Sequence, residues 1–191
     1  MIKKIVDKAI EYDVILDDER ELYTIAFTTL YFSIATWGTL ILLSLFFGKL
    51  FPSLIFLVFH IPLRVYAGGF HQPTRIRCYI QSLVIFVLML SGSITQTAQW
   101  NTYLFHIIFP LALVIFILAP VASSNKPLNN KEVSHHKIIS RCVLILELIL
   151  VIIFQQLRMN DCLYFALVSI FLVSVQIIIG FVDGRIKSYE K

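Results

Sequence analysis

Long stretches without charged side chains dominate this sequence, and their lengths predict helices that cross a membrane. A spanning helix needs about 20 predominantly apolar residues. The charge-free runs cover residues 22–48, 50–63, 78–125 and 162–182, and residues 142–157 contain a single acidic side chain, Glu147. The run 78–125 is long enough for two helices, joined between Ser91 and Asn101, where polar residues accumulate.

The pattern predicts an all-α, polytopic membrane protein of about six transmembrane or re-entrant helices. In chain order we expect them near residues 22–48, 50–63, 79–95, 101–120, 139–157 and 162–182. The second run is short, so its length leaves two alternatives open, a full crossing of a thinned bilayer or a re-entrant segment. Residues 22–182 then form one membrane bundle within a single domain that covers residues 1–191.

The first 20 residues follow a different pattern. Apolar side chains recur at helical spacing, opposite lysine and acidic side chains, at Ile2, Ile5, Val6, Ala9 and Ile10. Segment 1–20 is therefore predicted to contain an amphipathic helix that lies on the inner surface of the membrane. The alternative is a solvated leader without a function of its own.

Composition and charge support the membrane assignment and add an orientation. Hydrophobic residues make up 58% of the chain and charged residues 15%, which is far from the balance of a soluble enzyme or a DNA-binding domain. Lys and Arg residues in successive segments between the expected spans number 4, 1, 3, 0, 4, 1 and 3. Because cytoplasmic loops retain Lys and Arg, this alternation predicts six crossings, with both termini and residues 64–77 at the cytoplasmic face. The net charge of +4 then reflects topology, and we expect no nucleic-acid partner.

One short stretch, residues 64–78, concentrates polar and reactive side chains. Its Cys78 has Arg75 and Arg77 as near neighbours in the sequence. Nearby cations, a helix start or an imidazole base activate a thiol as a nucleophile. Pro73 is expected in the first turn of the helix that carries Cys78.

His71 is the nearest imidazole to Cys78 in the sequence, seven residues earlier. In one continuous helix the two residues would lie about 10 Å apart along the axis, beyond hydrogen-bond distance. Gly68, Gly69 and Pro73 instead favour a chain reversal that brings the imidazole beside the thiol. A Cys78–His71 dyad at the membrane surface is therefore a hypothesis, and the alternative is an unrelated interfacial histidine and helix-end cysteine.

Two polar residues follow Cys78 at helical spacing. Gln81 and Ser82 share its helix face and are candidates for orienting His71 or for donating to an oxyanion. The alternative is that they are ordinary polar residues between helices. No metal site is expected, because the adjacent pair His135–His136 points about 100° apart on a helix and no Cys or carboxylate stands at ligand spacing.

The pattern Arg-x-x-x-Gly-Gly-x-His-x(6)-Cys resembles that of the accessory gene regulator B (AgrB) family of quorum-sensing peptide processors. It is formed by Arg64, Gly68, Gly69, His71 and Cys78. A second stretch agrees, because Ala119-Pro120-Val121 ends a span and is followed by Asn125-Lys126-Pro127-Leu128, similar to an Asn-Lys-Pro loop of that family. Gln72 departs from the resemblance, since a small residue, often Ala, is expected next to the histidine.

The resemblance implies a membrane-embedded cysteine endopeptidase of the bacterial cell membrane. Its substrate would be a short AgrD-like propeptide. The enzyme would remove the C-terminal tail of the propeptide through a thioester acyl-enzyme and would promote cyclisation to a thiolactone or lactone autoinducing peptide. By family analogy Cys78 is the nucleophile and His71 the base, and no cofactor is required. Arg64 would hold an acidic tail or, alternatively, lipid phosphates. The further candidates for substrate binding are Gly68, Gly69, Arg75, Arg77 and Lys126.

Two alternatives from other functional classes remain, a peptide exporter without catalysis and a membrane signalling scaffold. In an exporter, Glu147 would dominate mutant phenotypes while Cys78→Ala would be silent. We expect Glu147 to face the bundle interior, either with a partner or protonated. A homodimer is a further hypothesis, because six helices of this length leave little interior for a peptide groove.

Overall fold

The computed structural model describes residues 2–70, 72, 74–121 and 130–189. Within this part of the chain there are seven α-helices, one 3₁₀ turn and no β-strand, which confirms the all-α prediction. In chain order the elements are α1 (Ile2–Glu11), η1 (Asp17–Glu19), α2 (Arg20–Phe46), α3 (Leu50–Ala67), α4 (Arg75–Thr95), α5 (Ala98–Leu118), α6 (Asn130–Gln156) and α7 (Asn160–Tyr189). Six of them, α2 to α7, are long and apolar enough to cross a membrane.

The helices extend beyond the apolar runs at their charged ends. α3 has 18 residues, more than the charge-free run 50–63, because it continues past Arg64 to Ala67. α6 begins at Asn130 rather than near residue 139, and α7 runs to Tyr189 rather than ending near residue 182. The short second run therefore belongs to a helix of spanning length, since a cation is well placed in the last turn of a helix and does not end it.

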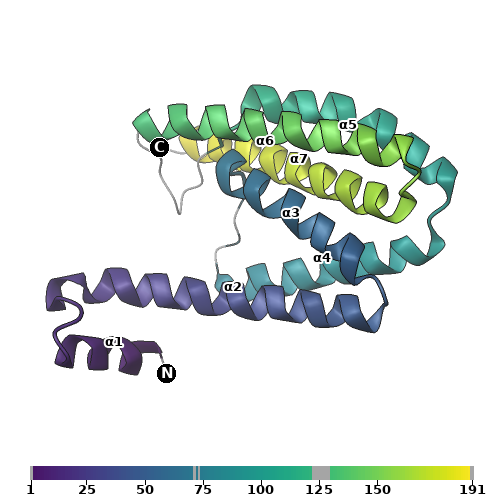
Figure 1. Ribbon diagram of the computed structural model, residues 1–191. Coiled ribbons are helices and arrows are strands. Elements are labelled where there is room, and N and C mark those ends of the chain that lie inside the picture. Colours follow the sequence, from purple (N-terminus) through teal and green to yellow (C-terminus); the bar gives the residue numbers. More distant parts are fainter. Residues whose placement is uncertain (1, 71, 73, 122–129, 190–191) are drawn as a thin grey trace.

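The spanning helices form two groups (Figure 1). α2 and α4 lie side by side, while α3, α5, α6 and α7 pack together. The larger hydrophobic core lies within the second group and includes Phe59, Leu144 and Ile170. The smaller core joins α2 and α4 to α3 and α7 and includes Leu40, Phe86 and Phe165. α3 and α7 contribute to both cores, so they hold the two groups together.

α7 is the central helix of the bundle. Half of its spanning window, 50%, is buried inside the structure, compared with 11% for α2. Its fully covered side chains lie on more than one face of the helix. They include Leu163, Phe165, Ala166, Leu167, Ile170, Val173 and Ile177. A helix that is apolar and covered around most of its circumference belongs in the centre of a bundle, where loops as well as helices can pack against it.

α1 is the expected amphipathic N-terminal helix, and it packs on the beginning of α2 (Figure 1). Val6 is fully buried, and Arg20 Nη1 donates to Asp7 Oδ1 at 2.7 Å. Part of the apolar side of α1 is therefore covered by protein. That α1 lies on the inner surface of the membrane stays a prediction.

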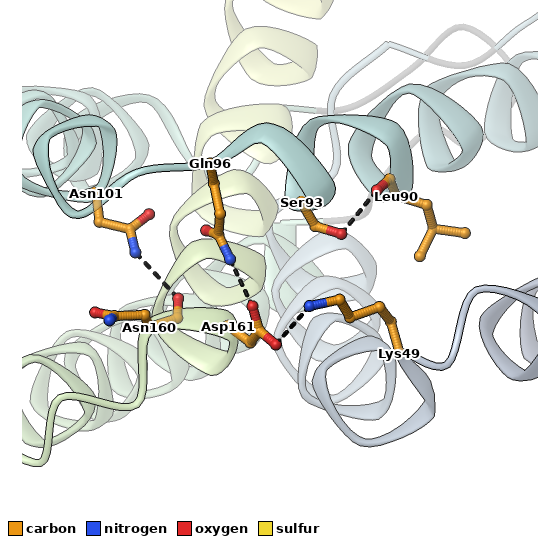
Figure 2. A network of polar contacts seen from close by, with 7 residues as sticks. All are labelled: Lys49, Leu90, Ser93, Gln96, Asn101, Asn160 and Asp161. Carbon is orange, nitrogen blue, oxygen red and sulfur yellow. Dashed lines mark hydrogen bonds and ion pairs between the residues drawn. The ribbon is translucent and has the colours of Figure 1, made fainter.

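One end of the bundle is tied together by polar side chains (Figure 2). Lys49, between α2 and α3, pairs with Asp161 in the first turn of α7 at 2.7 Å, and Gln96 donates to the same carboxylate at 2.6 Å. Asn101 in α5 donates to the Asn160 carbonyl oxygen at 3.1 Å. We call these five residues the Asp161 cluster. It brings the α2–α3, α4–α5 and α6–α7 turns to one end, so successive spanning helices run in opposite directions, as six crossings require.

Candidate functional site

The chain reverses direction between α3 and α4, at the end of the bundle opposite the Asp161 cluster. α3 ends at Ala67, and Gly68 and Gly69 follow with φ angles of 72° and 104°. Glycine adopts such angles readily, whereas residues with a Cβ atom are strained there. The predicted interruption between His71 and Cys78 is confirmed, because α4 begins only at Arg75.

Backbone hydrogen bonds join this reversal to the segment that follows α5. Gly69 N donates to Val121 O, and Val121 N donates to Ala67 O, both at 2.9 Å. Gly68 and Val121 thereby form a short parallel bridge. We call residues 67–70 and 119–121 together the Gly-Gly end. The described part of the second motif, Ala119-Pro120-Val121, therefore lies against the Gly68–Gly69 pair of the first.

The same reversal packs closely on α7. Phe70 N donates to the carbonyl oxygen of Gln176 at 2.9 Å. A Cβ atom on Gly180 would lie 2.5 Å from Phe70 N, and one on Gly69 would lie 2.8 Å from Gln176 O. These positions therefore require glycine. Sequence analysis missed Gln176 and Gly180, and the only signal for them was a glycine inside the apolar run 162–182.

Arg64, in the last turn of α3, holds the reversal from the helix side. Its guanidinium donates to the carbonyl oxygens of Gly68 and Phe70. The structure thus gives Arg64 a positioning role, while contact with a substrate tail or with lipid phosphate stays a prediction.

Cys78 lies exposed in the first turn of α4. Thr74 is the N-cap, since its hydroxyl accepts from Arg77 N at 3.4 Å. The helix therefore starts two residues after Pro73, and the expectation that Pro73 lies in its first turn is wrong because the threonine caps it instead. Pro73 and His71 lie outside the described residues, so the contact between imidazole and thiol stays a prediction.

The neighbours of Cys78 hold α4 against α2. Arg75 Nη1 donates to Thr29 Oγ1 at 2.5 Å, and the hydroxyl groups of Tyr79 and Thr39 are 3.1 Å apart. The Arg75 guanidinium thus contacts α2. The substrate-binding roles of Arg75, the exposed Arg77, Gly68 and Gly69 stay predictions. So does that of Lys126, which lies outside the described residues.

Gln81 and Ser82 lie one turn after Cys78 and are partly buried. Gln72 Nε2 donates to Gln81 Oε1 at 2.8 Å, which links the residue after His71 to the helix that carries the thiol. Sequence analysis singled out Gln72 only as a departure from the family pattern. Its partner could not be predicted, because the bond depends on how the reversal packs against α4.

An apolar cavity of about 460 Å³ opens between α4, α5 and α7. From α4 it is lined by Ile85, Met89 and Gly92, among others, which continue the helix face of Cys78 at helical spacing. Tyr164 of α7 lines it from the opposite side. The thiol and the cavity therefore share one face of α4, although Cys78 is not among the lining residues.

Glu147 faces the bundle interior, as predicted. It is 3% exposed, and neither carboxylate oxygen has a hydrogen-bond partner among the described residues. His60 stacks on Phe56 with ring centroids 5.0 Å apart. Of the two alternatives for Glu147, a partner is not found in the part of the chain that the structure describes.

Comparison with known proteins identifies the family. The family described as accessory gene regulator B matches residues 2–179. The chain is 34% identical over 114 residues to accessory gene regulator protein B of Staphylococcus intermedius, which covers 60% of this chain and 58% of that protein. It is 31% identical over 120 residues to the protein of the same name from Staphylococcus aureus (strain bovine RF122 / ET3-1), which covers 63% and 62%.

A third relative, accessory gene regulator protein B of Staphylococcus lugdunensis, is 28% identical over 120 residues, which covers 61% of either chain. The chain thus spans about three fifths of the length of the curated relatives it matches. No solved structure matches it. Because the family match contains both sequence motifs and nearly all of the membrane bundle, the chain belongs to the accessory gene regulator B family.

Proposed function

We propose that this chain is a membrane-embedded cysteine endopeptidase of quorum sensing. It cleaves the C-terminal tail from a short AgrD-like propeptide and promotes closure of a thiolactone or lactone ring. The observation that carries the proposal is an exposed thiol, Cys78, in the first turn of a helix beside a glycine reversal that Arg64 holds. Family membership supports it, because the Gly-Gly-x-His-x(6)-Cys pattern lies within the matched residues.

The first chemical step forms an acyl-enzyme. The Cys78 thiolate attacks the carbonyl carbon of the scissile peptide bond, and a C–S bond forms. The tetrahedral intermediate then expels the leaving amine, which takes its proton from the His71 imidazolium. The C–N bond is broken, the tail departs with its new amino terminus, and the core of the propeptide stays attached to Cys78 as a thioester.

The second step transfers the acyl group to the propeptide itself. Neutral His71 takes a proton from a propeptide thiol or hydroxyl, whose sulfur or oxygen attacks the thioester carbonyl carbon. The C–S bond to Cys78 breaks, and the thiolate and imidazolium are regenerated. Attack by water would give a linear peptide instead, so exclusion of water by the bilayer surface favours the ring.

The remaining candidates act around this pair. Arg64 keeps the reversal in place, and it is a candidate for holding an acidic tail together with Lys126. Ser82 and Gln81 are candidates for stabilising the oxyanion or for orienting His71. The site operates at the cytoplasmic face of the bacterial plasma membrane, with both chain termini in the cytoplasm, as the alternation of Lys and Arg favours. A homodimer remains a hypothesis within this proposal.

Co-expression of the full chain with an AgrD-like propeptide, followed by mass spectrometry, tests the proposal. We expect Cys78→Ala, Cys78→Ser and His71→Ala to lower cleavage by more than about 1000-fold, because each removes a group that acts in bond making. The matched control is Cys142→Ala, which removes another exposed thiol. It should leave cleavage unchanged. Full processing by Cys78→Ala would end the peptidase proposal, and mainly linear product in a single turnover would end the ring-closing step.

A second candidate function is peptide export without catalysis. The buried carboxylate of Glu147 favours it, because ionisable residues inside membrane helices often mark transport pathways. An exporter would lose peptide release in Glu147→Gln and would release uncut propeptide from Cys78→Ala at the normal rate. A signalling scaffold would show no change of propeptide length in Cys78→Ser or His71→Ala.

A further inference from the structure

Gln72 is bonded across the reversal to the helix that carries Cys78. Its Nε2 donates to Gln81 Oε1 at 2.8 Å, and both side chains are partly buried. Gln72 belongs to the link after α3, whereas Gln81 lies inside α4. The bond is therefore a tertiary contact, and helix formation alone does not require it.

The pair stands beside both members of the proposed dyad. Gln72 directly follows His71 in the sequence, and Gln81 is three residues after Cys78. Residues three apart are neighbours on one face of a helix. A small residue at position 72, which the family resemblance leads us to expect, would have no side-chain donor for Gln81. The glutamine at position 72 thus adds a bond that a small residue could not form.

The residues on both sides of position 71 are anchored. Before it, Phe70 N donates to Gln176 O at 2.9 Å, and the Phe70 carbonyl accepts from Arg64. After it, Gln72 is held by Gln81. The anchors come from three helices, α7, α3 and α4. Contacts of this kind restrict Phe70 and Gln72, and a restricted chain loses less entropy when its reactive groups are aligned.

We propose that the Gln72–Gln81 hydrogen bond is a positioning clamp, which holds the segment that carries His71 against the Cys78 face of α4. The two glutamines act through the histidine and take no part in bond making in this role. The inference rests on the proposed cysteine peptidase function. It predicts that loss of either glutamine impairs the pairing of imidazole and thiol, not only the rate of cleavage.

The test measures how fast iodoacetamide alkylates Cys78 across the pH range, in the full chain in membranes. Cys142→Ala and Cys162→Ala form the background, so that Cys78 is the only thiol. Iodoacetamide reacts with the thiolate, and an ordinary thiol forms it near about pH 8.5. A histidine partner keeps the thiolate available at lower pH. His71→Ala should therefore raise the pH at which alkylation is half-maximal.

Gln72→Met and Gln81→Met keep side-chain length and remove the hydrogen bond. Each should raise the half-maximal pH toward that of His71→Ala, and the double variant should add little, because both changes break the same bond. In the cleavage assay, kcat should fall about 10-fold with KM within about twofold. The charged groups of the surrounding elements, Arg64 from α3 and Arg75 and Arg77 from the helix of Cys78, are kept in every variant.

The matched control is Thr39→Val, which removes the hydrogen bond between Thr39 and Tyr79. That bond joins α4 to α2 at the residue after Cys78, but neither of its residues is next to position 71 in the sequence. It should leave the alkylation profile and kcat unchanged. An equal shift in Thr39→Val would mean that any loosening of α4 has this effect, and the clamp would be refuted.

The outcomes distinguish failure of the clamp from failure of the proposed peptidase function. If His71→Ala shifts the profile and Gln72→Met does not, the clamp is wrong and the peptidase proposal stands. If His71→Ala shifts nothing, the clamp has no imidazole to position and is overturned, while Cys78→Ala decides the peptidase proposal separately. Should Gln81→Met not accumulate in the membrane, Gln72→Met alone decides, because position 72 lies outside the helices.

Discussion

The two ends of the bundle are closed by different kinds of contact. At the Gly-Gly end, three backbone hydrogen bonds and glycine positions without room for a Cβ atom join α3, α5 and α7. At the Asp161 cluster, one ion pair and two amide hydrogen bonds join the helix turns through side chains. From Asp161 to Gly180 the ends are roughly 28 Å apart along α7, about the thickness of the hydrocarbon core of a bilayer.

The two ends therefore differ in how many substitutions they can accept. The backbone contacts of the Gly-Gly end require that its glycines carry no Cβ atom. Almost every substitution of these glycines therefore disturbs them. The Asp161 cluster depends on complementary charge and hydrogen-bonding groups, which other residue pairs can also supply. The end that carries the candidate site is therefore the less tolerant of the two.

The largest effect should come from adding one methyl group at the Gly-Gly end. Gly68→Ala combines a φ of 72° with a Cβ atom in collision with the Val121 carbonyl oxygen. Strain and overpacking together should lower the free energy of unfolding by about 2–5 kcal/mol and abolish propeptide cleavage. Thermal unfolding in detergent and the cleavage assay measure the two effects.

Gly48→Ala is the matched control at the other end. Its φ of 64° is similar, but nothing lies within 4 Å of a Cβ atom added there. It should lose only the conformational part, about 1–2 kcal/mol, and should retain cleavage. Equal losses of stability and cleavage in the two variants would show that close packing does not distinguish the ends.

A smaller effect is expected from Arg64→Lys. The lysine keeps the positive charge but cannot donate to the Gly68 and Phe70 carbonyl oxygens in the same forked geometry. Loss of one hydrogen bond from a charged donor should destabilise the fold by about 1.5–3 kcal/mol, and cleavage should fall at least about 10-fold. Arg158→Lys, at the exposed turn before α7, should change neither quantity. A stable Arg64→Lys variant with normal cleavage would contradict the positioning role.

Most spans could be predicted from the sequence because their apolar runs approach the length that a bilayer demands, and only the run 50–63 is clearly shorter. Their ends could not, because charge was taken to mark the end of a helix. Arg64 and Arg75 both lie within helices, since Arg64 bonds carbonyl groups of the following loop and Arg75 reaches α2. Long cationic side chains can remain in a helix while their charged groups find partners beside it.

The glycine reversal was predictable for a local reason, and its contacts were not. Gly68 and Gly69 indicate a break in a helix by their own conformational freedom. Their partners Val121 and Gln176 lie more than 50 residues away in the sequence, and nothing local marks them. The bond from Gln72 to Gln81 escaped prediction for the same reason, because it requires the link to fold back over the first turns of α4.

The smallest effect should come from the Asp161 cluster, and there a second change should repair the first. Lys49→Asp places two carboxylates together and should destabilise the fold by about 1 kcal/mol or less, because both side chains are partly exposed. Adding Asp161→Lys should restore stability. Gln96 can turn its amide and accept from the new ammonium group, since its Oε1 has no partner among the described residues. Cleavage should stay within about twofold throughout, because Gln96 is roughly 27 Å from Cys78 along α4. If the double variant were as unstable as Lys49→Asp alone, close packing rather than complementary charge would stabilise this end as well. The contrast between the two ends would then no longer hold.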